Sequence, residues 1–218
     1  MQIKRENVTV LLGENGSGKS TLIQILQKFY SFETGTIKVD AKSLNEINTQ
    51  YWRKIISVVP QEIKIFNGSI IYNICLDNDI DKVNETLKFS YDILGDFLFF
   101  DFFPQKHNTI IGEEGINISG GQRQIIGLLR ALISKPQLLL LDEVTSALDR
   151  NTELFILNLL QKLKKSMCIL LITHKIQTAK IGDYVYIISD GLIQDKGRPN
   201  DLLKKENLYT NMYNDFLN

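Results

Sequence analysis

The stretch "GENGSGKST" (residues 13–21) stands between two segments with different patterns. The apolar run "NVTVLL" (7–12) before it predicts a short buried strand, and "KSTLIQILQKF" (19–29) after it has apolar residues at helical spacing. Glycine is costly in regular structure, so three glycines here indicate a backbone that bends tightly or approaches something closely. The apolar face of the helix is expected to hold Leu22, Ile25, Leu26 and Phe29.

The spacing of this loop matches G-x-x-x-x-G-K-[ST], the Walker A phosphate loop, through Gly13, Gly18, Lys19 and Ser20. Its backbone N–H groups and the positive end of the helix dipole are expected to point at phosphate oxygens. Lys19 would supply a charge to the β and γ phosphates, and the Ser20 hydroxyl would ligate Mg²⁺. The predicted ATP contacts are Glu14, Asn15, Gly16, Ser17, Gly18, Lys19, Ser20 and Thr21.

A second motif lies in "QLLLLDE" (137–143), a continuous apolar run of strand length that ends in two carboxylates. Ligands of open α/β sheets bind at the carboxyl ends of the strands, which is where Asp142 and Glu143 fall. Asp142 therefore occupies the Walker B position and is expected to hold Mg²⁺ through water. Glu143 is then available to polarise a water for attack on the γ-phosphate.

Composition limits the range of folds and partners. The 218 residues suit one domain, or one domain with a smaller lobe, and the 44% of apolar residues can form a core. Lys plus Arg equals Asp plus Glu, 25 each, which argues against a broad nucleic-acid footprint. Cys75 and Cys168 form no CxxC pair and are interpreted as reduced thiols. No apolar run reaches the roughly 20 residues that cross a bilayer.

The remaining pattern alternates strands and helices around a helical block. A parallel sheet covered on both faces is expected, because its strands are uniformly apolar. The helical block at about 67–135 is interpreted as an insertion into this α/β fold. Further strands are expected at 35–40, 56–61, 167–173, 183–189 and 191–197, with a helix at about 151–164 and others near the C-terminus.

"ISGGQRQ" (118–124) resembles the "LSGGQ" signature of ATP-binding cassette (ABC) ATPases. It follows the helical insertion and precedes the Walker B strand, as in that family, and Ile118 replaces the usual leucine. The resemblance implies that ABC domains pair head to tail, so that two ATP molecules are buried between two subunits. The residues that would close on the ATP of the partner are Ser119, Gly120, Gly121 and Gln122.

Three further motifs of this family occur in order. Gln61 in "VVPQE" looks like the Q-loop glutamine, which ligates Mg²⁺ and senses the γ-phosphate. Asp149 in "SALD" (146–149) looks like the D-loop acid, and His174 in "LLITHK" matches the switch histidine. The resemblance therefore implies catalytic roles for Glu143, His174 and Gln61, with ATP and Mg²⁺ as cofactors.

The implied fold is a P-loop NTPase core with an inserted all-helical subdomain. Its parts are 1–60 (core, first part), 61–136 (helical subdomain with the signature) and 137–218 (core, second part). The N-terminal strands of the family fold are expected to be missing, and with them the aromatic residue that stacks on adenine. Either a fragment of a longer exporter or an unusual short form would explain this, and weakened ATP binding would follow.

The segment "TIIGEEG" (109–115) resembles the X-loop of ABC exporters through Thr109, Gly112, Glu113 and Gly115. "IFNGSIIYNI" (65–74) is similar to the exporter stretch that lies near the membrane domain. The resemblance implies a transmembrane partner, fused or separate, on the cytoplasmic side of the membrane, and export of a peptide, lipid or drug. No nucleic-acid partner is expected.

Two other functions stay open. One is a non-transport ABC ATPase that acts as a nucleotide-gated module on DNA or ribosomes, against which the X-loop and the balanced charge argue. The other is a cassette that binds ATP without turnover, against which Lys19, Glu143 and His174 argue. The aromatic cluster "FLFFDFF" (97–103) also has two interpretations, packing between the lobes or a groove that docks the membrane domain.

Overall fold

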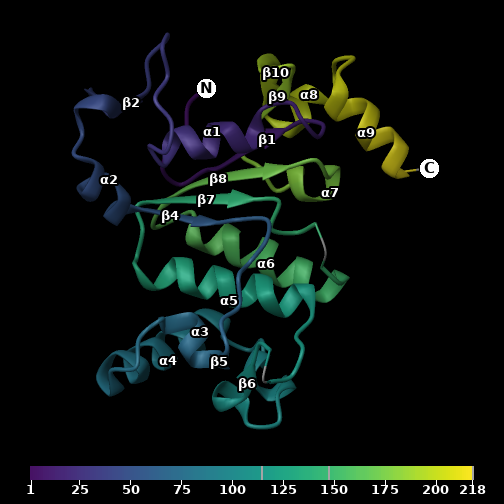
Figure 1. Ribbon diagram of the computed structural model, residues 1–218. Coiled ribbons are helices and arrows are strands. Elements are labelled where there is room, and N and C mark those ends of the chain that lie inside the picture. Colours follow the sequence, from purple (N-terminus) through teal and green to yellow (C-terminus); the bar gives the residue numbers. More distant parts are fainter. Residues whose placement is uncertain (114, 147, 218) are drawn as a thin grey trace.

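A computed structural model describes residues 1–113, 115–146 and 148–217 (Figure 1). The strands of its central sheet are β1 (Val8–Leu12), β4 (Ile56–Val59), β7 (Leu138–Asp142), β8 (Cys168–Thr173), β9 (Tyr184–Ser189) and β10 (Leu192–Gly197). Their order in the sheet is β10-β9-β1-β8-β7-β4. All neighbours pair in parallel except β9 and β10. The predicted parallel sheet is confirmed, with one antiparallel strand at its edge.

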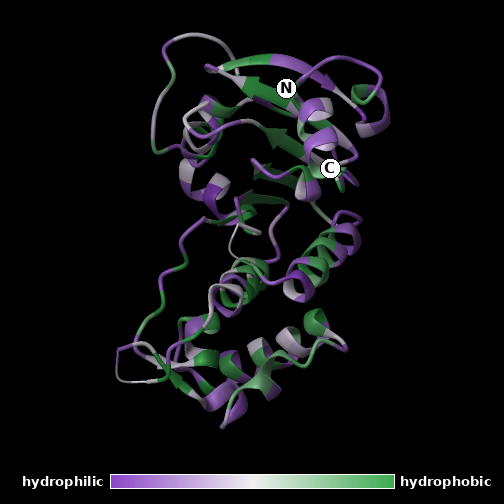
Figure 2. Ribbon diagram, turned by 90° about the vertical axis from the view of Figure 1, so that its right-hand side faces the viewer, coloured by the Kyte–Doolittle hydropathy of each residue, from purple (hydrophilic) through white to green (hydrophobic). Residues whose placement is uncertain are grey.

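Both faces of this sheet are covered, which explains why its strands are apolar without alternation. The covering helices are α1 (Lys19–Leu26), α5 (Gly120–Ile133) and α6 (Arg150–Leu163). Val8, Val10 and Leu12 of β1 pack into one core cluster, and Leu11 packs into another on the opposite face. Helix α1 lies on one side of the sheet and helices α5 and α6 lie on the other (Figure 1). The edge strand β10 is mostly exposed, whereas Figure 2 colours the central strands as hydrophobic.

Helix α1 is shorter than the sequence indicated, and the predicted apolar face is confirmed only in part: Leu22 and Leu26 pack into the core, whereas Phe29 does not. The helix ends at Leu26, and its buried residues are Lys19, Ile23 and Leu26. Lys28 adopts a φ of 57°, a left-handed conformation that cannot continue a helix. Phe29 therefore lies beyond the end of the helix and is 60% exposed, with the Arg53 guanidinium 4.9 Å from its ring centre.

A small layer follows α1 before the sheet resumes. It consists of β2 (Lys38–Val39), β3 (Lys42–Ser43), the 3-10 turn η1 (Leu44–Glu46) and helix α2 (Thr49–Ile55). The strand expected at 35–40 is therefore only two residues long, and it pairs with β3 in a hairpin. Leu44, Trp52 and Ile56 form a third, separate core cluster beneath this layer.

The inserted subdomain is helical except for one short ribbon. Its elements are β5 (Gly68–Ser69), α3 (Ile70–Cys75), α4 (Ile80–Leu94), the 3-10 turns η2 (Phe99–Phe102) and η3 (Lys106–Asn108), β6 (Ile110–Ile111) and α5. Strands β5 and β6 pair antiparallel, which the sequence did not indicate because two residues are too few to show a period. The subdomain forms the lower part of the molecule in Figure 1.

The aromatic cluster at 97–103 serves mainly as packing. Phe99, Phe100 and Phe103 are at most 5% exposed. Phe97 stacks on Phe155 of α6 with ring centres 4.1 Å apart, so the cluster also joins the subdomain to the core. Leu98 and Phe102 are more than 60% exposed. Docking of a membrane domain at 97–103 stays a prediction.

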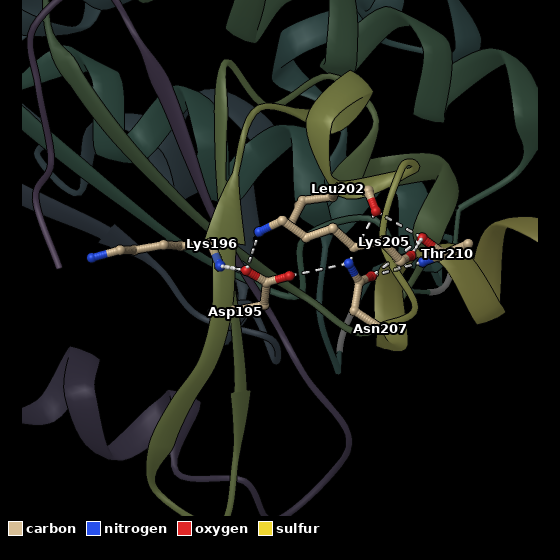
Figure 3. A network of polar contacts seen from close by, with 6 residues as sticks. All are labelled: Asp195, Lys196, Leu202, Lys205, Asn207 and Thr210. Carbon is tan, nitrogen blue, oxygen red and sulfur yellow. Dashed lines mark hydrogen bonds and ion pairs between the residues drawn. The ribbon is translucent and has the colours of Figure 1, made fainter.

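The C-terminal segment is fastened to the edge strand β10. It contains α8 (Pro199–Leu202) and α9 (Leu208–Leu217), whereas α7 (Ile176–Ala179) lies between β8 and β9. Figure 3 shows Asp195 of β10 accepting from Lys205 Nζ at 2.9 Å and from Asn207 Nδ2 at 3.2 Å. Lys205 also lowers the pKa of Asp195. The Thr210 hydroxyl donates to the Leu202 carbonyl at 2.9 Å, which closes the turn between α8 and α9.

Among the described helices, none combines the length and the apolar character that crossing a bilayer requires.

Candidate functional site

The glycine loop lies at the carboxyl end of β1 and leads directly into α1. Gly16 and Gly18 have φ values of 82° and 96°, which glycine adopts without strain. Gly18 is also the N-terminal cap of α1, and a glycine offers no side-chain acceptor for the first N–H groups of the helix. These N–H groups and the helix dipole can therefore bind an anion.

Lys19 is only 5% exposed and lies along the loop. Its Nζ donates to the carbonyl oxygens of Gly13 and Glu14, at 3.0 and 2.8 Å. Burying an ammonium group costs free energy unless the group is hydrogen-bonded, and these two carbonyls accept its hydrogen bonds. The lysine charge is thus held at the centre of the loop, where it would attract phosphate oxygens.

A cavity of about 360 Å³ opens above this loop. Its lining combines phosphate-loop residues with two residues far away in the sequence, Gln61 and Glu143. The lining residues are Asn15, Gly16, Gly18, Lys19, Ser20, Thr21, Gln61 and Glu143. Of the other predicted ATP contacts, Ser17 is buried and Glu14 lines a neighbouring hollow toward β9 and β10.

Glu143 is the meeting point of three predicted motifs. The Gln61 carboxamide donates to Glu143 Oε2 at 3.1 Å. His174 Nδ1 lies 3.0 Å from Glu143 Oε1, but the angle of this contact does not meet hydrogen-bond geometry. Glu143 is only 8% exposed and has a φ of 51°, a conformation that costs energy for a residue with a side chain. Such strain is concentrated at functional sites, and here it coincides with the contacts to Gln61 and His174, which supports the predicted role of Glu143.

Asp142 is the last residue of β7 and carries a half-buried carboxyl group. Burial raises its pKa, and the nearby Ser20 hydroxyl works in the opposite direction. Its Oδ1 is buried and has no hydrogen-bond partner among the described residues. A buried carboxylate oxygen without a donor is a fitting ligand for a hard cation such as Mg²⁺.

This cation would not be held by the protein alone. Within the described ranges, no group of three or more His, Cys, Asp and Glu side chains is placed to bind a metal. Mg²⁺ commonly uses one or two carboxylates, several waters and substrate phosphates instead. Ser20, Gln61 and Asp142 near the phosphate loop suit that arrangement.

The signature residues lie outside the cavity. Ser119 caps α5: its hydroxyl accepts from Gln122 N at 3.1 Å, and Gln122 Oε1 accepts from Ser119 N at 2.8 Å. Ser119 and Gly120 are exposed. None of the four signature residues is among the described residues that line the cavity. Ile118, the position that departs from leucine, is only 7% exposed, so a similar apolar shape suffices there.

The D-loop acid and the signature helix are neighbours in this chain. A Cβ at Gly121 would lie 3.4 Å from Thr152 and 3.6 Å from the Asp149 carboxylate. Asp149 caps α6 by accepting from the N–H groups of Asn151 and Thr152, both at 3.0 Å, and Thr152 lowers its pKa. Ala147, within the predicted D-loop stretch, lies outside the described residues.

The described residues of the predicted X-loop lie beside β5, and Glu114 is outside the described residues. Gly112 has a φ of 103°, and a Cβ on it would come within 2.9 Å of Asn67. A Cβ on Gly115 would lie 2.3 Å from the Ile110 carbonyl oxygen, and the buried Thr109 hydroxyl accepts from Gln105 N at 2.9 Å. Close packing therefore requires both glycines.

Two residues near the site were missed by the sequence analysis. Lys175 Nζ donates to the carbonyls of Thr145 and Ser146, both at 2.9 Å, and so holds the segment that follows Glu143. Gln124 Nε2 donates to the carbonyl of Gln61 at 2.8 Å. A contact between a side chain and a distant carbonyl leaves no periodicity, and the only available signal was that each residue adjoins a motif.

The first residue of the loop offers a test of this geometry. A Cβ on Gly13 would lie 2.4 Å from the Ile188 carbonyl oxygen, so Gly13→Ala requires a backbone shift. We expect a loss of about 1–3 kcal/mol in the free energy of unfolding, together with weaker ATP binding. Urea unfolding and ATP titration would measure both. Gly197→Ala is the control, because its nearest contact is an ordinary 3.5 Å; equal losses in the two variants would contradict the prediction.

Comparison with known proteins gives a consistent result. Residues 1–146 match the family described as "ABC transporter". A Rickettsia bellii protein named for export ATP-binding and permease functions is 40% identical over 205 residues, which are 93% of this chain and 35% of that protein. The alpha-hemolysin translocation ATP-binding protein HlyB of Escherichia coli O157:H7 is 36% identical over 214 residues, 98% of this chain and 30% of its own length.

A solved structure agrees with these relatives. A bacterial Atm1-family ABC exporter with ATP bound superposes with a TM-score of 0.85 at 28% identity, over 100% of this chain and 38% of that one. The chain thus spans about a third of the length of the proteins it resembles. The match covers the phosphate loop, the signature and the Walker B strand in their family order. The chain belongs to the ABC transporter family.

Proposed function

We propose that this chain is the motor of an exporter, and that it couples ATP-driven, head-to-tail pairing of two such domains to transport across a membrane. The observation that carries the proposal is the cavity in which Lys19, Gln61 and Glu143 converge while the signature lies elsewhere on the chain. A site that is complete in phosphate-binding and base residues, but separate from its own signature, favours completion by a second domain.

Phosphoryl transfer depends mainly on positioning and on charge neutralisation, and the residues divide accordingly. The loop N–H groups and Lys19 bind the phosphates. Ser20, Gln61 and Asp142 would hold Mg²⁺, which when bound neutralises charge on the β and γ phosphate oxygens. Glu143 accepts a proton from the attacking water. The Gln61 carboxamide holds one oxygen of this carboxylate by a hydrogen bond, and His174 lies beside the other oxygen.

The partner's signature would complete the site. Ser119 at the N-terminus of α5 presents a hydroxyl and a helix dipole, and both favour a phosphate. Asp149 lies next to Gly121, so the D-loop and the signature of one chain would approach the partner as one unit. Pairing would therefore bury two ATP molecules, each held by residues of both subunits.

The remaining parts of the proposal rest on the relatives. Proteins named for export carry this domain within a chain about three times longer, which suits a fused or associated membrane domain. We infer a position on the cytoplasmic side of that membrane and a peptide, lipid or drug as cargo. The direct test is ATP-dependent uptake into inverted membrane vesicles that contain the chain with its membrane domain; uptake without ATP hydrolysis would contradict the proposal.

Magnesium dependence provides a test of Asp142 in the isolated chain. Asp142→Asn keeps the shape of the side chain but removes its charge, so we expect the Mg²⁺ concentration that half-saturates ATP hydrolysis to rise about 10–100-fold. Hydrolysis would be followed by phosphate release during a MgCl₂ titration. Asp92→Asn, an exposed change on α4, is the matched control. An unchanged magnesium requirement in Asp142→Asn would show that Asp142 does not hold the ion.

A further inference from the structure

The segment at 61–66 runs from the catalytic cavity into the inserted subdomain without regular structure. No backbone–backbone hydrogen bond joins these six residues to any part of the chain that the structure describes. Such a segment is mobile unless side chains hold it, because its carbonyls otherwise bond only to water. Its first residue, Gln61, nevertheless places a carboxamide 3.1 Å from Glu143. Something must fix this end of the segment.

One stripe of α5 supplies the contacts. Gln124, Gly127 and Arg130 are spaced three residues apart and therefore share one side of the helix. Gln124 Nε2 donates to the Gln61 carbonyl at 2.8 Å, and Arg130 Nη1 donates to the Lys64 carbonyl at 3.1 Å. Arg130 Nε also donates to the Asn73 carbonyl, at 2.8 Å, which joins the same stripe to α3.

Gly127, the middle residue of the stripe, contributes by leaving space next to the helix. A Cβ on Gly127 would lie 2.4 Å from Ile63 Cδ1, so the glycine allows Ile63 to rest directly on the helix. Asn73 completes the arrangement, because its carboxamide bonds both the N–H and the carbonyl of Phe66 at 2.8 Å. The segment is thereby anchored at residues 61, 63, 64 and 66.

Packing alone does not explain a glutamine at position 124. The side chain is 7% exposed, and its Oε1 is buried without a hydrogen-bond partner among the described residues. An unsatisfied buried acceptor costs stability, which an apolar side chain of the same size would avoid. What the glutamine gains is the one bond from its Nε2 to the Gln61 carbonyl.

We propose that Gln124 is a positioning residue for Gln61, and that the stripe Gln124, Gly127 and Arg130 makes the cavity end of segment 61–66 move with the signature helix. Ser119 caps the N-terminus of helix α5, so the same rigid element carries the signature at that end and holds Gln61 through Gln124 about one turn later. A displacement of the helix would shift the Gln61 carboxamide relative to Glu143. This inference rests on the proposed function for its catalytic consequence, but not for the anchoring itself.

The main variant is Gln124→Leu, which removes the donor and the unsatisfied Oε1 together and is expected to fold. In ATP hydrolysis by the full chain we expect kcat to fall about tenfold, with KM for MgATP within about twofold, because misplacement affects the reaction more than binding. If Gln124 acts through Gln61, the loss should be absent in a Gln61→Ala background, as for two residues that form one unit.

Gln161→Leu is the matched control. Gln161 lies in α6 and also donates its Nε2 to a loop carbonyl, that of Ile181 at 2.6 Å, so its loss removes an equivalent bond away from the segment. We expect kcat in this variant to stay near the wild-type value. A second pair tests the glycine: Gly127→Ala should lower kcat by displacing Ile63, and Ile63→Ala in the same chain should restore most of it.

A measurement without ATP separates this inference from the proposed function. Lys64 is exposed, and we expect trypsin to cleave after it severalfold faster in Gln124→Leu than in the wild type or in Gln161→Leu. Cleavage and turnover equal to wild type in Gln124→Leu would overturn the inference, as would losses that multiply with Gln61→Ala. A wild-type chain that never hydrolyses ATP, but shows the cleavage difference, would contradict the proposed function and leave the anchoring supported.

Discussion

Replacing Glu143 by Gln is expected to lower steady-state ATP hydrolysis at least about a hundredfold while ATP still binds. A positioned general base contributes roughly 10²–10⁴ to a rate, and Glu143 is the carboxylate that faces the phosphate cavity. Glutamine keeps nearly the same shape, so the buried position is not opened and the phosphate loop is not disturbed. Phosphate release would measure the rate, and equilibrium dialysis would measure ATP affinity.

The surroundings of Glu143 sharpen this expectation. One carboxylate oxygen faces Gln61 and the other faces His174. A glutamine here would turn an N–H₂ group, which cannot accept a proton, toward one of these two neighbours. The matched control is Glu85→Gln, an exposed change on α4, which we expect to leave both quantities unchanged. Hydrolysis near the wild-type rate in Glu143→Gln would mean that another group activates the water.

The parts of the fold that could be predicted are those specified by local spacing. The Walker A loop requires particular residues at fixed positions between a strand and a helix, and the structure has β1, the loop and α1 in that order. The Walker B strand was recognisable because β7 is buried on both faces and therefore has an unbroken apolar run. The convergence of Gln61, Glu143 and His174 followed from the resemblance, because no local pattern joins them.

What could not be predicted depends on contacts over long distances in the sequence. Gln124 and Gln61 are 63 positions apart, and Lys175 reaches a carbonyl 30 positions away. The end of α1 depends on a left-handed Lys28, a conformation that residue type alone does not favour. Two-residue strands such as β5 and β6 are too short to show a period in the sequence, and their pairing joins residues about 40 positions apart.

Head-to-tail pairing of two chains predicts that the mass of the particle in solution doubles when MgATP binds. In the Glu143→Gln chain, which should bind ATP without consuming it, we expect MgATP to raise the mass in light scattering from 25.0 kDa to twice that value. The bound phosphates would then attract the exposed N-terminus of the partner's α5. Ser119→Arg in this background should abolish the shift, because a bulky side chain would occupy the space between the signature and the partner's ATP.

The substitution also removes a helix cap, and the control must account for that. Losing the Ser119 cap costs on the order of 1 kcal/mol of stability, and Ser43→Arg removes a comparable cap from η1 at a distance from the signature. We expect Ser43→Arg in the Glu143→Gln chain to pair normally. If Ser119→Arg also paired normally, the signature would not lie at the interface. If the Glu143→Gln chain bound ATP but stayed at 25.0 kDa, and also failed to pair when joined to its membrane domain, a shared site would be excluded, because each cavity would then hold ATP without a partner.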